Sequence, residues 1–67
     1  MIYKVSYVVV GQPDLGEIVN LDTPPRVGDR VTLGDEPCEV IEVIDLIPPR
    51  ENFAYLHVTC RPLQKAR

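Results

Sequence analysis

The chain has 67 residues, of which 45% are hydrophobic and 25% charged, and its formal net charge is −3. This length allows one small domain and excludes a roomy active site, because so short a chain buries only about 60% of the surface that it exposes when unfolded. The acidic balance disfavours extensive contact with nucleic-acid phosphates, and the composition is that of a folded domain.

The composition favours strands throughout. Ten Val, five Ile and three Thr are β-branched, whereas Ala occurs only twice. Such side chains fit a pleated sheet better than a helix. Seven Pro and four Gly divide the chain into short segments, which predicts an all-β fold of short strands.

The first predicted hairpin joins a strand at 2–10 to a strand at 17–21 through a turn at 11–14. One face of the first strand is apolar at every second position: Tyr3, Val5, Tyr7 and Val9. This period is typical of a half-buried strand. The opposite face ends in Val8 and Val10, which predicts that this end of the strand is covered on both sides.

A turn and a third strand follow at 25–33. Pro25 restricts φ and Gly28 permits φ above zero, so Val27 is expected to tuck under the turn. The fourth strand is predicted at about 38–45, where strict alternation breaks. A β-bulge near Ile41 would turn the Val residues on both sides of it inward.

A longer connection is predicted at 46–52, with one 3₁₀ turn at 49–52 after the two prolines. The fifth strand runs from 53 or 54 to 61, and residues 63–67 form a tail beyond a domain of 1–62. We therefore expect a small five-stranded barrel or a strongly bent antiparallel sheet. Its predicted interior consists of Tyr3, Val5, Tyr7, Val31, Leu33, Val40, Leu56 and Val58.

One pattern in this region suggests a family. Residues 25–31 read Pro-x-Val-Gly-Asp-x-Val, and after a turn residues 38–43 read Cys-x-Val-x-x-Val. The pattern resembles the centre of small SH3-like β-barrel proteins, many from bacteria and their phages and mostly of unassigned function. Cys38 stands where an aromatic residue is usual. The resemblance implies the barrel and implies no functional residue.

Metal binding is not expected, and neither is any cofactor. His57 and Cys60 are three positions apart, which places them on opposite faces of a strand. If the last two strands pair around Pro49, Cys38 falls almost opposite Cys60. The two cysteines then form either a cross-strand disulfide or two buried thiols, and a reducing cytosol favours the thiols.

No pattern indicates catalysis, so we expect no enzyme activity. Ser6 lies in the middle of a strand, Gly-x-Ser-x-Gly is absent, and the four glycines make no phosphate-binding loop. The acids between 35 and 45 lack the spacing of a calcium loop. They are interpreted as a solvated edge that opposes pairing with other sheets.

The remaining candidate site lies between 47 and 57. It consists of Ile47, Arg50, Phe53, Tyr55 and His57. Two prolines stiffen this segment, and aromatic and Arg residues on rigid backbone carry much of the energy of protein interfaces. Phe53 is expected to be either a plug of the barrel end or a binding anchor.

These residues predict a non-catalytic protein-interaction or structural module of a larger assembly. The alternative is a small barrel that binds single-stranded nucleic acid through the same basic and aromatic residues. No segment reaches the roughly 20 apolar residues of a membrane helix, and the N-terminus lacks the features of a signal peptide. We therefore expect a cytoplasmic protein with a protein partner, as a monomer or a homo-oligomer.

Overall fold

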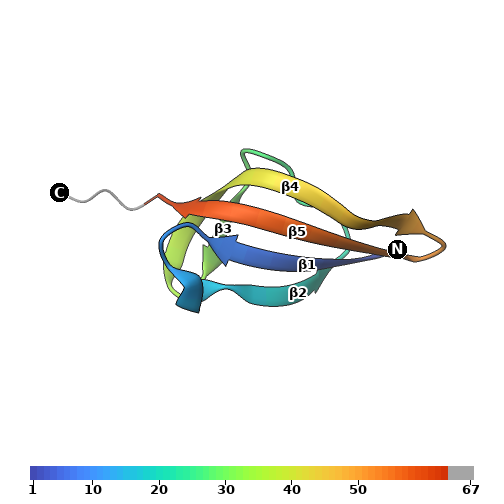
Figure 1. Ribbon diagram of the computed structural model, residues 1–67, viewed down its shortest axis with the longest axis horizontal. Coiled ribbons are helices and arrows are strands. Elements are labelled where there is room, and N and C mark those ends of the chain that lie inside the picture. The colour runs from blue at the N-terminus through green and yellow to red at the C-terminus, as the bar shows by residue number, and fades with distance from the viewer. Residues whose placement is uncertain (64–67) are drawn as a thin grey trace.

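Five strands form one mixed sheet that curls into a half-barrel, as the computed structural model shows (Figure 1). The structure describes residues 1–63, apart from the side chains at positions 48 and 49. Its elements are β1 (Ile2–Val9), η1 (Pro13–Leu15), β2 (Glu17–Leu21), β3 (Arg30–Leu33), β4 (Glu36–Arg50) and β5 (Phe53–Pro62). The all-β prediction is confirmed, whereas the predicted tail lies outside the described residues from position 64 onward.

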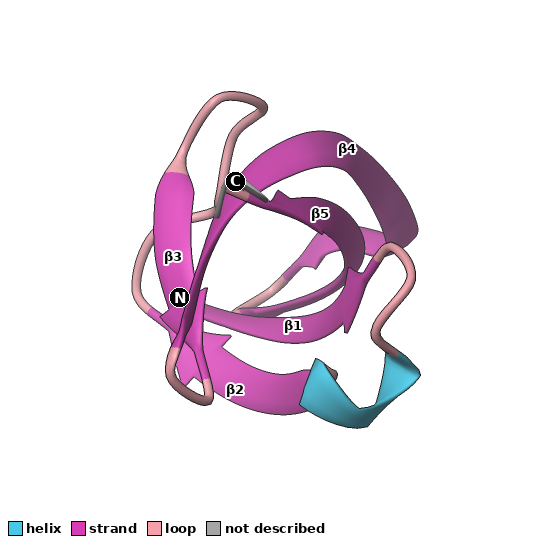
Figure 2. Ribbon diagram, turned by 90° about the vertical axis from the view of Figure 1, so that its left-hand side faces the viewer, coloured by secondary structure: helices cyan, strands magenta, loops and turns pink. Residues whose placement is uncertain are grey.

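The strand order is β2-β1-β5-β4-β3, with β1 and β5 parallel and the other neighbours antiparallel. In this order β2 and β3 are the two edge strands, and the sheet between them is strongly curved (Figure 2). This architecture agrees with the SH3-like resemblance at the level of a small, curled, five-stranded sheet. It also adds the parallel pairing, which the sequence patterns did not predict.

The core lies on the concave face of the sheet. Its buried residues are Val5, Tyr7, Val9, Leu33, Cys38, Val40, Leu56, Val58 and Cys60. Tyr3 and Val31 pack against this cluster, so the predicted interior is confirmed. Burying one Val or Leu side chain contributes about 1.5–3 kcal/mol, and β5 supplies every second residue from Ala54 to Cys60.

The predicted bulge in β4 is present. Val40 pairs with Cys60 and Glu42 pairs with Thr59, so Ile41 is the extra residue. Because one residue is inserted, the alternation shifts by one position. Val40 is therefore buried and Val43 packs against the core, while Ile41 remains exposed.

The predicted connection at 46–52 is wrong in its extent. β4 continues to Arg50, and two further register shifts follow, between Asp45 and Ile47 and between Ile47 and Arg50. Proline cannot donate a backbone hydrogen bond, but a strand tolerates it at a bulge or on an unpaired edge. On its side away from β5, β4 pairs with β3 only at positions 36–39. The two prolines lie beyond this stretch, where no strand in the described part of the chain needs a backbone N–H from them.

The turn between β4 and β5 also differs from the expectation. Arg50 pairs with Phe53, which leaves only two residues in the turn, and Glu51 adopts φ of 55° there. This compact turn leaves no room for a 3₁₀ turn at 49–52. The 3₁₀ turn found in the described residues is η1, between β1 and β2, where Pro13 begins it.

The turn before β3 is tied to β4 by backbone hydrogen bonds. Gly28 N donates to Val40 O and Val40 N donates to Asp29 O, both at 2.8 Å. Gly28 has φ of +96°, as predicted. Val27 does not tuck under the turn, because it is 66% exposed while Pro25 takes the buried position.

The convex face of the sheet is exposed over much of its surface. Val8 and Val10 are both solvent-exposed. The expectation that the sheet is covered on both faces at the C-terminal end of the first strand is therefore wrong. The reason is that the sheet forms a single layer with one core on its concave side. No helix in the described part of the chain is long and apolar enough to cross a membrane.

We predict that Gly28→Val destabilises the fold by about 1–3 kcal/mol, the usual cost of holding a β-branched residue at φ above zero. A Cβ added at Gly28 meets no atom within 4 Å, so backbone strain rather than a clash causes the loss. Urea unfolding measures it. Gly28→Asn is the control and should lose less, because Asn tolerates positive φ. Equal stability of all three proteins would contradict the left-handed turn.

Candidate interaction surface

The structure brings all five predicted site residues onto one face of the β4–β5 hairpin. Tyr55 and His57 alternate with the buried residues of β5 and so point to the convex face. Ile47 lies directly opposite Tyr55, and Arg50 lies opposite Phe53. Residues directly opposite one another in a sheet share a face and contact one another. The five are therefore neighbours, on strands rather than on the predicted loop.

Three further residues extend this surface, and the sequence analysis missed them. Ile2 and Lys4 of β1 lie beside Phe53 and Tyr55 through the parallel pairing, and Ile44 of β4 lies opposite His57. We name the combined set the outer-face patch: Ile2, Lys4, Ile44, Ile47, Arg50, Phe53, Tyr55 and His57. Only the pairing of β1 with β5 shows that residues more than 50 positions apart belong together. The alternation in β1 already placed Ile2 and Lys4 on the face opposite to its apolar one, and this was the one signal that the sequence offered.

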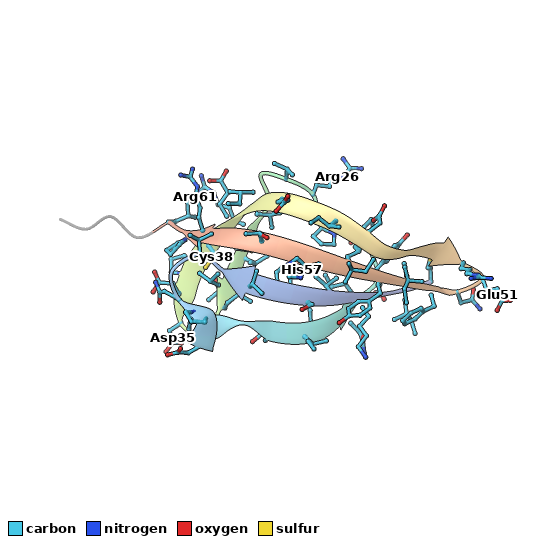
Figure 3. The ribbon with its side chains drawn as sticks, viewed as in Figure 1. Arg26, Asp35, Cys38, Glu51, His57 and Arg61 are labelled. Atoms are coloured by element: carbon cyan, nitrogen blue, oxygen red, sulfur yellow. The ribbon has the colours of Figure 1, made fainter. Side chains whose placement is uncertain are left out.

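The patch is apolar and open to solvent. Ile2 is 50% exposed, Ile44 41%, and Ile47 and Phe53 40% each. Phe53 lies outside the core cluster, which contradicts its interpretation as a plug, whereas its role as a binding anchor stays a prediction. Figure 3 shows His57 near the middle of the sheet and Glu51 at the tip of the hairpin. The patch thus covers the half of the convex face nearest that tip.

Charges on the convex face are divided between its two halves. Away from the tip, Arg61 Nη2 lies 2.9 Å from Glu39 Oε1 and Thr59 Oγ1 donates to Glu42 Oε1 at 3.4 Å. Near the tip, Lys4 Nζ lies 5.9 Å from the centroid of the Tyr55 ring. This cation–π contact contributes about 0.5–1 kcal/mol at an exposed site.

The two cations of the patch have no acidic partner among the described residues. Within the described part of the chain, no carboxylate lies at ion-pairing distance from Lys4 or Arg50. Their charges are therefore available to a binding partner. The described residues also enclose no pocket, so a ligand would meet this surface rather than enter a cavity.

The cysteines lie in the core and not in the patch. Cys38 pairs with Pro62, and Val40 rather than Cys38 lies opposite Cys60. The two cysteines are therefore diagonal neighbours, two positions from being directly opposite, because this part of the ladder is centred near position 50 rather than at Pro49. Diagonal neighbours across antiparallel strands have Cα atoms about 7–8 Å apart, beyond the usual range for a disulfide. Both residues are free, buried thiols.

Burial, followed by the neighbouring Cys38, raises the pKa of the Cys60 thiol to about 11. The pKa of Cys38 is raised as well, by burial and then by Glu36. Both thiols are therefore protonated near neutral pH and pack as small apolar groups. Among the described residues, no group of three or more His, Cys, Asp or Glu side chains is placed to hold a metal ion.

Comparison with protein-family models, with curated proteins and with solved structures gives no match for this chain.

We predict that Phe53→Ala lowers the free energy of unfolding by less than about 1.5 kcal/mol, because Phe53 is 40% exposed outside the core. Leu56→Ala, at a neighbouring buried position, should cost about 2–5 kcal/mol. Urea unfolding of both variants provides the comparison. A loss from Phe53→Ala as large as that from Leu56→Ala would restore the plug interpretation.

A second prediction concerns alkaline pH. The thiol of Cys60 ionises near pH 9.0 in the unfolded chain and near 11 in the folded one, so the unfolded state binds fewer protons between these values. The stability contribution of the protonated thiol is complete below pH 9 and falls, by on the order of 2 kcal/mol, as the pH rises through that window. Cys60→Ala removes this ionisation. Unfolding measured from pH 8 to 11 should show the wild type losing more stability than the variant, and a constant difference would contradict the shift.

Proposed function

We propose that this chain is a non-catalytic, SH3-like small β-barrel module that docks on a protein partner as an accessory or structural part of a larger assembly. The outer-face patch carries the proposal. It is an apolar and aromatic surface over three adjacent strands, and nothing in the described part of the chain covers it. Contiguous exposed apolar surface on a small soluble domain usually marks an interaction site.

The edges of the sheet are poorer docking sites than its face. β2 has five residues and β3 has four, and short edge strands discourage the addition of another strand. The free edge of β4 is longer, but it has bulges near Ile41 and Leu46 and prolines at 48 and 49. These features block regular pairing with a second strand. A partner is therefore expected to bind the side chains of the convex face.

Binding of single-stranded nucleic acid is the second candidate. The position of Lys4 over Tyr55 favours it, together with Arg50 opposite Phe53, because small barrels stack bases on aromatic side chains flanked by cations. Two cations on a chain of net charge −3 offer little neutralisation of phosphates. The exposed isoleucines beside them add apolar area that suits a protein interface better.

The variant Phe53→Ala/Tyr55→Ala tests the proposal. The wild type and this variant are used as bait in a cell lysate, and the captured proteins are quantified by mass spectrometry. We expect the variant to remain folded and to lose the wild-type partners, since truncation removes the two largest aromatic anchors of the patch.

Val10→Ala/Val27→Ala is the matched control, because it shortens two exposed apolar side chains outside the patch and should keep every partner. A folded patch variant that still captures all wild-type partners would contradict the site. Nucleic acid that copurifies with the wild type, seen as high absorbance at 260 nm, and not with the patch variant would favour the second candidate.

A further inference from the structure

The charge of the outer-face patch is opposite in sign to that of the whole chain. Its two charged members, Lys4 and Arg50, are both cationic. Subtracting their charge of +2 from the net charge of −3 leaves −5 for the remaining residues. An acidic protein thus presents an exposed apolar surface between two cations that no carboxylate of the described residues reaches.

The positions of these cations define what the patch can recognise. Lys4 lies on β1 and Arg50 on β4, on the two sides of β5. Since neighbouring strands lie about 4.8 Å apart, the two strands are about 10 Å apart across the sheet. Phe53 and Tyr55 of β5 fill the space between them, and the Lys4 ammonium already reaches over the Tyr55 ring, 5.9 Å from its centroid.

We propose that the outer-face patch binds a segment of a partner protein in which apolar side chains are accompanied by carboxylates. The apolar groups contact Ile2, Phe53 and Ile47, and the carboxylates pair with Lys4 and Arg50. This inference rests on the proposed function and specifies the chemistry of the partner. Charge complementarity of this kind selects partners and speeds their association.

Two other occupants of the patch fit less well. A second copy of the chain docked through the same surface would bring the cations of both copies together, because a two-fold interface places the same patch on both sides. A single strand of nucleic acid would satisfy the cations but would leave Ile2, Ile44 and Ile47 against a charged backbone. Both occupants give distinct results in the experiment below.

The experiment uses the full chain and a displayed library of random linear peptides. Selection is carried out in parallel on the wild type, on Lys4→Glu/Arg50→Glu and on the control Arg26→Glu/Arg30→Glu. The control makes the same change in charge at two exposed positions outside the patch. Circular dichroism first verifies that all three proteins are folded.

We expect peptides selected on the wild type and on the control to combine apolar residues with Asp or Glu. Those selected on Lys4→Glu/Arg50→Glu should lose this acidic preference or carry Lys and Arg instead. The best wild-type peptide should bind the charge-reversed patch at least about tenfold more weakly. Its affinity for the wild type should fall with added salt, as ion pairing at an exposed surface requires.

Four results would overturn the inference. Apolar peptides without an acidic preference, whose binding Phe53→Ala/Tyr55→Ala abolishes, would contradict the partner chemistry and leave the proposed function standing. Failure of the library to enrich any peptide on the patch would contradict both. Tighter binding of oligothymidylate than of any peptide, or a dimer in sedimentation that Phe53→Ala/Tyr55→Ala dissociates, would assign the patch to nucleic acid or to a second copy.

Discussion

The position of β5 between β1 and β4 is the constraint on which the rest of the structure depends. β5 is hydrogen-bonded along both sides, to β1 in parallel and to β4 antiparallel. Its even-numbered residues from Ala54 to Cys60 are all buried, so it contributes to the core along nearly its whole length. The remaining strands attach to this central pair of ladders as hairpins. The same alternation turns Tyr55 and His57 outward, so that core and candidate surface are the two faces of one strand.

β4 shows how local irregularity allows a strand of 15 residues in so small a domain. A bulge at Ile41 re-aims Val43 toward the core, and the later shifts absorb Leu46 and the two prolines. Bulges increase the local twist and bend of a strand, as the curvature of the sheet requires. They also leave an edge that pairs poorly with other strands. The long β4–β5 hairpin therefore provides the area of the patch without leaving a regular strand edge open to pairing.

The distribution of charge follows from the same pairing. Ladder neighbours match Glu39 with Arg61 and Glu42 with Thr59 at one end of the convex face. At the other end Lys4 lies between Asn20 and Tyr55 and Arg50 lies opposite Phe53, so within the described residues neither cation has a carboxylate at ion-pairing distance. An exposed ion pair such as Arg61 with Glu39 contributes little to stability. Among the described residues Arg26 and Arg30 also lack an ion pair, but Lys4 and Arg50 are the two cations that lie beside the exposed apolar side chains of the patch.

The sequence by itself determined the local features of this protein. Alternation identified the core-facing residues of β1 and β5, the break in alternation located the bulge at Ile41, and Gly28 marked the left-handed turn, because each depends on residues close together in the chain. It also placed Phe53, Tyr55 and His57 among the candidate site residues. Only the tertiary structure decided that β1 pairs with β5, that β4 continues through its prolines, and that Cys38 lies diagonal to Cys60. Pairing between distant strands depends on how the whole sheet buries its apolar face, and neither periodicity nor local propensity specifies that choice.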